Sequence, residues 1–386
     1  MNAAGPPAAM PVRRRGMLAW AAGFALPWSV AQARAASAFE PRALQFPRDH
    51  GTHNEAHTEW WYLTGHATAA SGNVYGFQVT FFRSRVDGAQ ALRSRLAAKQ
   101  LLFAHAAITD AKGQKLWHDQ RIARWNGEPP DQPTDIESPG AAYALENDTA
   151  VALRGWSLRR LPNGSYQIRV KANGFLIELN ALPTQAYLLQ GQQGFSRKGP
   201  ETAQSSFYVS QPQLAVTGRL GLQGQAINIA QGMAWLDHEW NESLLHPEAV
   251  GWDWIGMNLD NGDSLTAFRL RRSDGSALWA GGSWRAASKG SDPLGAQIFA
   301  PGEVRFEPLR FWTSPLTQAR YPVSWSVATP AGTFTVQSLI DAQELDSRQS
   351  TGTVYWEGLS DLLNTQGQRV GRGYLEMTGY AQRLVL

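Results

Sequence analysis

Three short segments of the sequence place carboxylates and histidines directly beside tryptophan. They read HTEWWYLTGH at residues 57–66, WLDHEW at 235–240 and GWDWIG at 251–256. Tryptophan has a large apolar surface and is seldom left in water. A neighbouring carboxyl group is therefore expected to lose hydration, which raises its pKa and can keep it protonated at neutral pH. These segments predict a general acid, or the lining of a pocket for a large apolar ligand.

Asp253 is the candidate acid with the clearest surroundings, because it lies between Trp252 and Trp254. Hydration of an isolated alkene requires a proton delivered to carbon and aromatic faces beside the cation that forms. In a strand, Asp253 would point away from both tryptophans. We expect it to face an enclosed lumen close to His238, with a pKa raised by desolvation. The alternative is a structural carboxylate that accepts an indole N–H.

Glu59 and His105 also stand in apolar surroundings. Alternation puts Glu59 and Trp61 on one face of a strand, whereas His105 alternates with apolar residues in another. We interpret Glu59 and His105 as a buried, hydrogen-bonded pair, and a catalytic role is the open alternative. The residues expected to contact a ligand are Trp61, Glu59, His105, Tyr208, Trp252 and Trp254.

Histidines and carboxylates also raise the question of a metal. His53 and His57 are four residues apart, with Glu59 two further on, and Asp237 and His238 come later in the chain. This spacing of four would place both histidines on one face of a helix, but the HExxH sequence that is typical of helical zinc sites is absent. We therefore favour a hydrogen-bonded acid–imidazole network and predict no tightly bound metal and no cofactor.

A hydrolase is an open alternative. Ser205 and Ser206 could serve as nucleophiles with His238 as the base. The GxSxG sequence that marks a nucleophile elbow is absent from the chain.

The first 38 residues are predicted to be an export signal. Arg13, Arg14 and Arg15 precede an apolar run from Met17 to Val30, and small-residue cleavage sites follow. The paired arginines favour the twin-arginine route, with an ordinary secretory signal as the alternative. The mature protein is then periplasmic or secreted.

Removal of this segment changes the charge of the chain. Of the 35 basic residues four lie in the first 38, so 31 remain against 32 acidic residues, and the formal charge of +3 disappears. The mature chain thus carries no basic surplus that would favour nucleic acid as a partner. The chain contains no cysteine, which excludes a cysteine nucleophile and any thiolate metal site.

The rest of the sequence is typical of a β protein. Short alternating runs are separated by turn sequences such as PNG at 162–164 and DNGD at 260–263. Short helices are expected at 89–100 and 357–364. An aromatic hairpin beginning at Trp60 is repeated at Trp252, with Asp253 aligned to Trp61. We place a domain boundary near residue 242, between domains 39–242 and 243–386.

The sequence also resembles a known family. The segments FPRDHGTHNEAHTEWWYLTGHA at 46–67, LLFAHAAITD at 101–110, SSFYVS at 205–210, AWLDHEW at 234–240, YWEGL at 355–359 and GRGYLEMTGY at 371–380 are similar to the AttH and carotenoid 1,2-hydratase group of two-domain lipocalin-like proteins. The resemblance implies an all-β fold of two lipocalin-like antiparallel β-barrel domains in tandem. It also implies that His238, Trp240 and Asp253 are the catalytic acid and its partners.

Together these observations predict an exported protein with a tryptophan-lined cavity for a hydrophobic or amphipathic small molecule. The resemblance implies a hydro-lyase or isomerase that uses acid catalysis on an alkene, as in the carotenoid 1,2-hydratases. The alternatives are a non-catalytic binding protein associated with an ABC-type transporter, and a secreted hydrolase.

Overall fold

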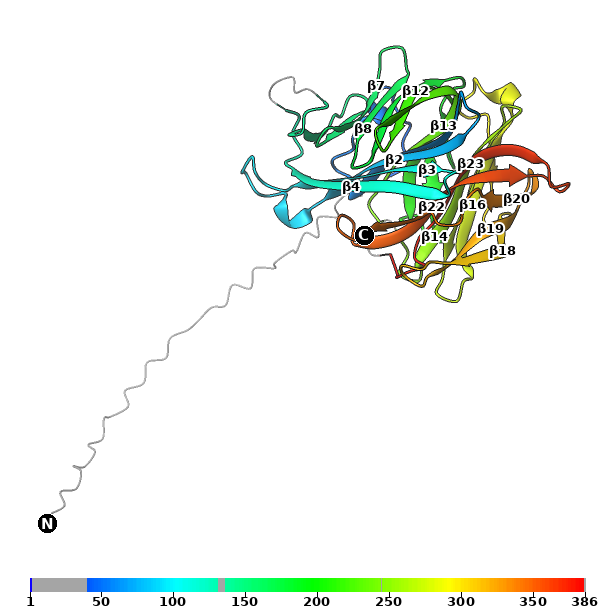
Figure 1. The fold of residues 1–386 in the computed structure, drawn as a ribbon. Coiled ribbons are helices and arrows are strands. Elements are labelled where there is room, and N and C mark those ends of the chain that lie inside the picture. Colours follow the sequence, from blue (N-terminus) through cyan, green and yellow to red (C-terminus); the bar gives the residue numbers. More distant parts are fainter. Residues whose placement is uncertain (2–39, 131–135, 244, 385–386) are drawn as a thin grey trace, which may run out of the picture. The chain divides into compact units, whose positions relative to one another are not determined.

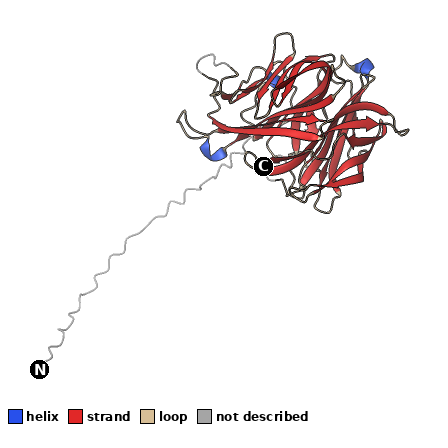
Figure 2. Cartoon of the chain, in the orientation of Figure 1, coloured by secondary structure: helices blue, strands red, loops and turns tan. Residues whose placement is uncertain are grey.

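The computed structural model describes Met1 and residues 40–130, 136–243 and 245–384. Nearly all of the predicted export signal, 1–38, lies outside these described residues. The described chain consists mainly of β-strands (Figure 2), which confirms the all-β prediction. Its helices are three single 3-10 turns: η1 (Arg48–His50), η2 (Asp87–Ala89) and η3 (Ala287–Lys289). No helix among the described residues could cross a membrane.

The first sheet has 13 antiparallel strands and holds residues 58–241. Its strands are β1 (Thr58–Ala69), β2 (Val74–Arg85), β3 (Gln100–Asp110), β4 (Lys115–Trp125), β5 (Ala142–Ala144), β6 (Ala150–Leu153), β7 (Trp156–Arg160), β8 (Tyr166–Lys171), β9 (Phe175–Pro183), β10 (Leu188–Leu189), β11 (Phe195–Arg197), β12 (Ser205–Leu222) and β13 (Gln225–Asn241). The outermost strands of the main path, β4 and β5, contact each other, so this sheet is a nearly closed barrel.

The second sheet has ten antiparallel strands and holds residues 251–377. Its strands are β14 (Gly251–Leu259), β15 (Ser264–Arg271), β16 (Ala277–Arg285), β17 (Gln297–Phe299), β18 (Arg305–Thr313), β19 (Arg320–Thr329), β20 (Gly332–Ser338), β21 (Glu344–Ser347), β22 (Thr353–Leu363) and β23 (Arg369–Met377). The two sheets match the lipocalin-like fold that the sequence predicted (Figure 1).

Both sheets begin in the same way. A hairpin opens each sheet, β1–β2 or β14–β15, and the last strand of the sheet, β13 or β23, pairs with the free edge of the hairpin's first strand. In this arrangement Glu59 lies opposite Arg83, and Asp253 lies opposite Arg269. The structural repeat therefore aligns Asp253 with Glu59. The sequence pattern had aligned Asp253 with Trp61, which lies two residues further along β1.

Each sheet uses its two faces differently, because successive side chains of a strand point to opposite sides. One face packs on the core of its own sheet, which contains Trp61 in the first sheet and Trp356 in the second. The other face looks toward the partner sheet. There an apolar cluster is drawn from both sheets and includes Tyr62, Trp254 and Phe268.

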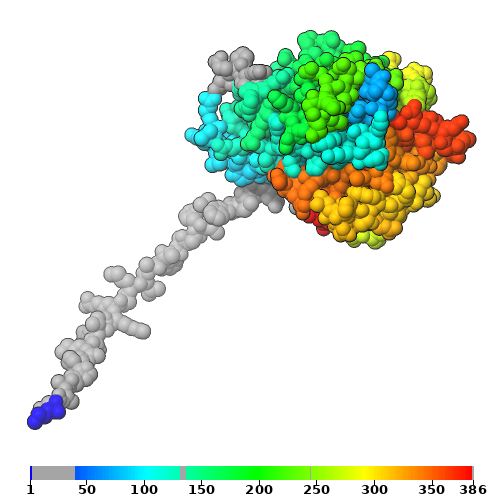
Figure 3. All heavy atoms as spheres, viewed as in Figure 1, coloured from blue at the N-terminus to red at the C-terminus, as the bar shows by residue number. Residues whose placement is uncertain are grey.

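Hydrogen bonds join the two sheets where β3 and β4 meet the connection between β21 and β22. The Gln120 amide donates to the backbone oxygen of Asp346 at 2.9 Å, and the Ser350 hydroxyl donates to Gln120 at 2.6 Å. Figure 3 shows this contact as cyan atoms lying against orange ones. Residues 38–386 form one compact unit. The chain passes from one sheet to the other between Asn241 and Gly251, and the domain boundary at 242 stays a prediction.

Both predicted helices are wrong. At 89–100 the chain forms turns, because residues 90–96 are all exposed and offer no apolar face that could stabilise a helix. Residues 357–363 belong to β22, where pairing with β23 and burial on both faces favour a strand.

Candidate functional site

A cavity of about 300 Å³ lies between the two sheets. Its size is at the lower end of the range for small-molecule sites, roughly 300–1,000 Å³. Its walls come from strands of both sheets, at alternating positions along most of them. The tryptophans and phenylalanines of the lining are Trp60, Phe82, Phe103, Trp252, Trp254 and Phe268, and its tyrosines are Tyr62, Tyr208 and Tyr355. The indole of Trp254 lies across Gly256, where a Cβ would collide with the ring.

Four of the residues that the sequence predicted to contact a ligand line this cavity. They are His105, Tyr208, Trp252 and Trp254. The other two, Glu59 and Trp61, lie on the opposite face of β1, in the interior of the first sheet. His238 and Trp240 face the same interior, because they pair with Trp61 and Glu59 across the β1–β13 ladder.

The predicted position of Asp253 is wrong. Its side chain is fully buried but does not line the cavity, because Trp252 and Trp254 take that face of β14. Its carboxylate accepts from Arg269 Nε at 2.7 Å and from the Tyr380 hydroxyl at 2.9 Å, rather than lying beside His238. Asp253 does point away from both tryptophans, but the enclosed space lies between the sheets, on the tryptophan side.

Asp237 is an acid of the cavity that the sequence analysis did not choose. Three groups hold its carboxylate: the hydroxyls of Tyr208 and Ser210, each at 2.6 Å, and the indole N–H of Trp235 at 2.7 Å. Burial outweighs these hydrogen bonds and raises the pKa of Asp237 to about 7. The Tyr208 hydroxyl in turn accepts from the indole of Trp254 at 3.1 Å, which links this acid to the second sheet.

The second sheet contributes two further acids to the cavity, Glu357 on β22 and Glu376 on β23, which pair across the ladder. Burial and the charges of Asp237 and Glu239 raise the pKa of Glu376 to about 8. Glu376 is partly exposed, whereas Glu357 is buried, and both border the cavity. Burial and the charge of Glu376 also raise the pKa of Glu357 well above its usual value. The cavity therefore holds carboxyl groups that are neutral near pH 7.

Glu239 completes the acidic lining, and it is ion-paired. Lys198 Nζ lies 3.0 Å from its carboxylate and sits over the rings of Tyr208 and Phe268, at 4.3 and 4.4 Å from their centres. This pair places the one lysine of the lining against aromatic faces, a favourable position for a cation.

His105 bridges the two sheets at the cavity wall. Its Nδ1 is hydrogen-bonded to the Tyr355 hydroxyl, and its Nε2 lies 2.8 Å from the Ser350 hydroxyl. Burial lowers the pKa of His105 to about 3, so the imidazole is neutral. The interpretation of His105 and Glu59 as a pair is therefore wrong: both are buried and bonded, but to different partners.

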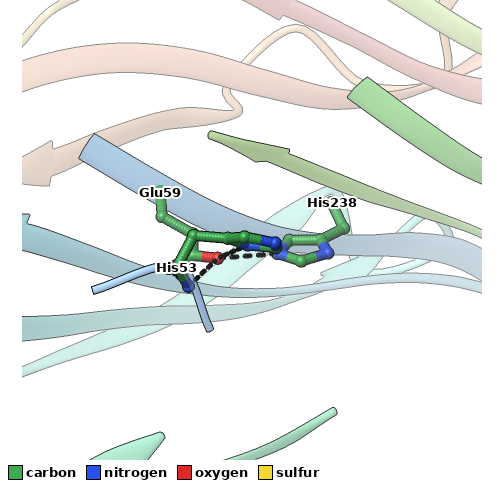
Figure 4. A group of neighbouring side chains, drawn as sticks. All are labelled: His53, Glu59 and His238. Carbon is green, nitrogen blue, oxygen red and sulfur yellow. Dashed lines mark hydrogen bonds and ion pairs between the residues drawn. The ribbon is translucent and has the colours of Figure 1, made fainter. Parts of the chain in front are cut away.

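Glu59 is the centre of a buried network behind the cavity wall (Figure 4). Its carboxylate lies 3.0 Å from His53 Nδ1 and 2.9 Å from His238 Nε2, and it accepts from Arg83 Nε at 2.8 Å. His53 continues the network to Asp49 at 2.9 Å. The expected acid–imidazole network thus exists, although its residues come from three separate segments.

The charges in this network follow from its hydrogen bonds. Burial acts to raise the pKa of Glu59, but Arg83 and the two imidazoles outweigh it and hold the pKa well below its usual value. Burial opposes protonation of His53, yet the bonds to Asp49 and Glu59 raise its pKa. For His238, burial prevails and lowers the pKa. Glu59 is therefore a carboxylate, and His238 is neutral.

His53, Glu59 and His238 could also supply ligands to a metal ion, since their ligand atoms lie within 4.8 Å of one another. Nitrogen and oxygen donors of these types suit zinc. However, hydrogen bonds already join all three, and Arg83 shares the same carboxylate. The predicted lack of a tightly bound metal stays a prediction, which metal analysis of the purified protein checks.

The serine residues proposed for a hydrolase are not arranged around His238. The Ser205 hydroxyl donates to the backbone oxygen of Thr202, and the Ser206 hydroxyl is buried without a hydrogen-bond partner. His238 is bonded to Glu59 instead. A histidine–serine hydrogen bond does exist at the cavity, but between His105 and Ser350.

One signal in the sequence could have identified the cavity acids. In WLDHEW, residues 235, 237 and 239 share one face of β13, and 238 and 240 share the other. The tryptophan-rich faces of β1 and β14 line the cavity through Trp60 and Trp254. Pairing WLDHEW with these faces selects Asp237 and Glu239 rather than His238.

Comparison with known proteins shows which family has this architecture. The AttH-like family model matches residues 37–380. A crystal structure of a proposed AttH from Nitrosomonas europaea is 42% identical, covers 89% of this chain and 99% of its own, and has a TM-score of 0.78. Kievitone hydratase from Nectria haematococca shares the fold at 13% identity, with a TM-score of 0.63 over 90% of this chain and 95% of its own. A search of curated proteins finds no match. The chain therefore belongs to the AttH-like family.

Proposed function

We propose that this protein is a hydro-lyase-type enzyme that adds water to, or removes water from, a carbon–carbon double bond of a small apolar molecule held between the sheets. One observation carries the proposal: acidic side chains with raised pKa values line a cavity walled by aromatic rings. Acid catalysis at carbon needs a carboxyl group that is protonated at rest, and aromatic faces can stabilise the cation that forms.

Two acids, Glu376 and Asp237, have different roles in this reaction because their surroundings differ. Glu376, with a pKa of about 8, is the proton donor. Asp237, with a pKa of about 7, receives three donated hydrogen bonds that favour its ionised form, and it accepts the proton of the attacking water. Environments that separate the pKa values of two carboxyl groups are a common basis of acid–base pairs. Trp252 and Trp254 stand beside the cation.

This division predicts a bell-shaped pH profile. Activity rises as Asp237 loses its proton near pH 7 and falls as Glu376 loses its proton at higher pH, so the maximum lies well above the ordinary range of carboxyl pKa values. A general acid contributes roughly 10²- to 10⁴-fold to rate. Glu376→Gln should therefore lower turnover by about that factor and remove the alkaline limb, while the ligand still binds.

The test follows uptake of oxygen-18 from labelled water into a panel of terpene alkenes, by mass spectrometry. Asp253→Asn is the discriminating control, because Asp253 lies off the cavity and its variant should retain turnover if folded. Loss of turnover in Asp253→Asn with full activity in Glu376→Gln would restore the original choice of acid. Ligand that binds wild-type protein without any turnover would support the binding-protein alternative.

We also propose export to the periplasm and hand-over of the ligand to an ABC-type transporter, and a carotenoid-like polyene as one candidate ligand. These proposals rest on the sequence: Arg14 and Arg15 before an apolar run, and the resemblance to carotenoid 1,2-hydratases. Mass spectrometry of the protein from a periplasmic fraction gives its first residue and its co-purified small molecules. A protein that begins at Met1 in the cytoplasm contradicts export.

A further inference from the structure

Three buried polar atoms of the cavity lining have no hydrogen-bond partner among the described residues: the hydroxyl oxygens of Tyr62 on β1 and of Thr353 on β22, and Oε2 of Glu357 on β22. Of these residues, Tyr62 and Glu357 are neighbours that come from different sheets. Both side chains are nine-tenths or more buried, at 4% and 3% exposure. A buried polar atom without a partner is unfavourable, because it has lost its hydration and gained no hydrogen bond in return, so such atoms call for an explanation.

Two other hydroxyls of the cavity are satisfied within the protein. The hydroxyls of Tyr208 and Tyr355 are bonded to Asp237 and His105. Tyr62 and Glu357 are neighbours. The Tyr62 hydroxyl is near enough to the Glu357 carboxyl for its hydrogen-bonding influence to oppose part of the rise in the pKa of Glu357. The two groups nevertheless do not meet the geometry of an ordinary hydrogen bond. The two groups are therefore close enough to reach one small atom between them.

Both groups are hydrogen-bond donors at neutral pH. Burial raises the pKa of Tyr62 and, with Glu376, that of Glu357, so each keeps its proton. Two donors that converge on one point match an atom with two lone pairs and no hydrogen of its own. A carbonyl oxygen has this property. An amine or a metal cation needs acceptors instead, and a hydrocarbon leaves both groups unpaired.

We propose that Tyr62 and Glu357 form a carbonyl-binding subsite, and that the ligand is a small ketone or enone whose oxygen accepts from both side chains while its apolar body lies against the tryptophans. This deepens the proposed function and rests on the same cavity.

The test compares two matched terpenes, carvone and limonene, which share a ring skeleton and differ in a ketone. Quenching of tryptophan fluorescence reports binding, since Trp60, Trp252 and Trp254 line the cavity. Wild-type protein should bind carvone at least tenfold more tightly than limonene. Tyr62→Phe and Glu357→Met should each reduce this preference to less than threefold, with limonene affinity unchanged.

Two further variants keep the test sharp. Glu357→Gln retains a donor and should keep most of the preference for carvone. Tyr355→Phe removes a cavity hydroxyl that is already bonded to His105, and it should leave the preference intact. Equal affinity of wild-type protein for both terpenes, or a preference that survives Tyr62→Phe, would overturn the subsite. Because binding is measured without turnover, a catalytically silent protein that prefers carvone refutes the proposed reaction alone.

Discussion

The opening hairpins of the two sheets carry the same buried ion pair in different surroundings. In the first sheet Arg83 Nε lies 2.8 Å from Glu59, and in the second Arg269 Nε lies 2.7 Å from Asp253. Both carboxylates are fully buried and face the interior of their own sheet. The repeated pair thus belongs to the shared framework of the two halves.

The partners added around each pair differ. Glu59 also receives hydrogen bonds from Thr52 and from the backbone and ring of His53, and it is bonded to His238. Asp253 has the Tyr380 hydroxyl and a second arginine, Arg271, at 3.7 Å.

The arginines differ in the same way. Arg83 also donates to backbone oxygens and to Gln100, whereas Arg269 lies over the rings of Trp325 and Phe306. The first pair is held by hydrogen bonds, and the second is held largely by aromatic faces. An acid beside histidine and tryptophan in the sequence can therefore be part of the framework while the reactive groups lie on the other face.

Replacing the arginine should give the largest difference in stability between the two ion pairs. Arg83→Met leaves Glu59 without its permanently charged partner and should cost about 3–5 kcal/mol of unfolding free energy. Arg269→Met should cost less, because Arg271 and Tyr380 still contact Asp253. Denaturant unfolding measures both. If Arg83→Met does not accumulate, the double variant Arg83→Met with Glu59→Gln should recover folded protein. An equal or larger loss for Arg269→Met would contradict the comparison.

Acid should reveal the charge of Glu59. Its pKa in the folded protein lies well below that in the unfolded chain, so its contribution to stability is complete above the unfolded value of about 4.3 and is lost as pH falls. Glu59→Gln should be clearly less stable than wild type at pH 7. This difference should shrink by up to about 1.4 kcal/mol per pH unit below pH 4. A difference that stays constant from pH 7 to pH 3 would show that Glu59 is not held ionised.

The hydroxyl donors should give the smallest effects. Thr52→Val and Tyr380→Phe each remove one hydrogen bond to a buried carboxylate, at 2.7 and 2.9 Å. Hydrogen bonds to charged groups contribute about 1.5–3 kcal/mol, and we expect Thr52→Val to fall in this range. Tyr380→Phe should cost about 1 kcal/mol, because the two arginines still neutralise Asp253. Thermal unfolding of both variants at pH 7 provides the comparison, and a greater loss for Tyr380→Phe would reverse it.

Much of the fold could be predicted from the sequence, because alternation and turn residues report strands locally. Alternation also assigned side chains to faces correctly: Glu59 with Trp61, and Asp253 opposite its two tryptophans. It could not tell which face borders the cavity. Each sheet buries both faces, one on its own core and one on the partner sheet, so both faces carry large apolar residues.

The choice of Asp253 over Asp237 followed from this ambiguity. A sequence pattern fixes position along a strand, but the docking of one sheet on the other depends on contacts between residues more than a hundred positions apart. The contact of His105 with Tyr355, 250 positions apart, is of this kind. The acids of the cavity become evident only when both sheets are in place.

The origin of the cavity walls has a consequence for stability. Because the lining comes from both sheets, neither residues 58–241 nor residues 251–377 alone enclose a site. A ligand bound there contacts both sheets. Its binding free energy therefore adds to the free energy that holds the two sheets together. By mass action, ligand at a hundred times its dissociation constant contributes about 2.7 kcal/mol. The free energy of unfolding of the protein therefore depends on the concentration of its ligand.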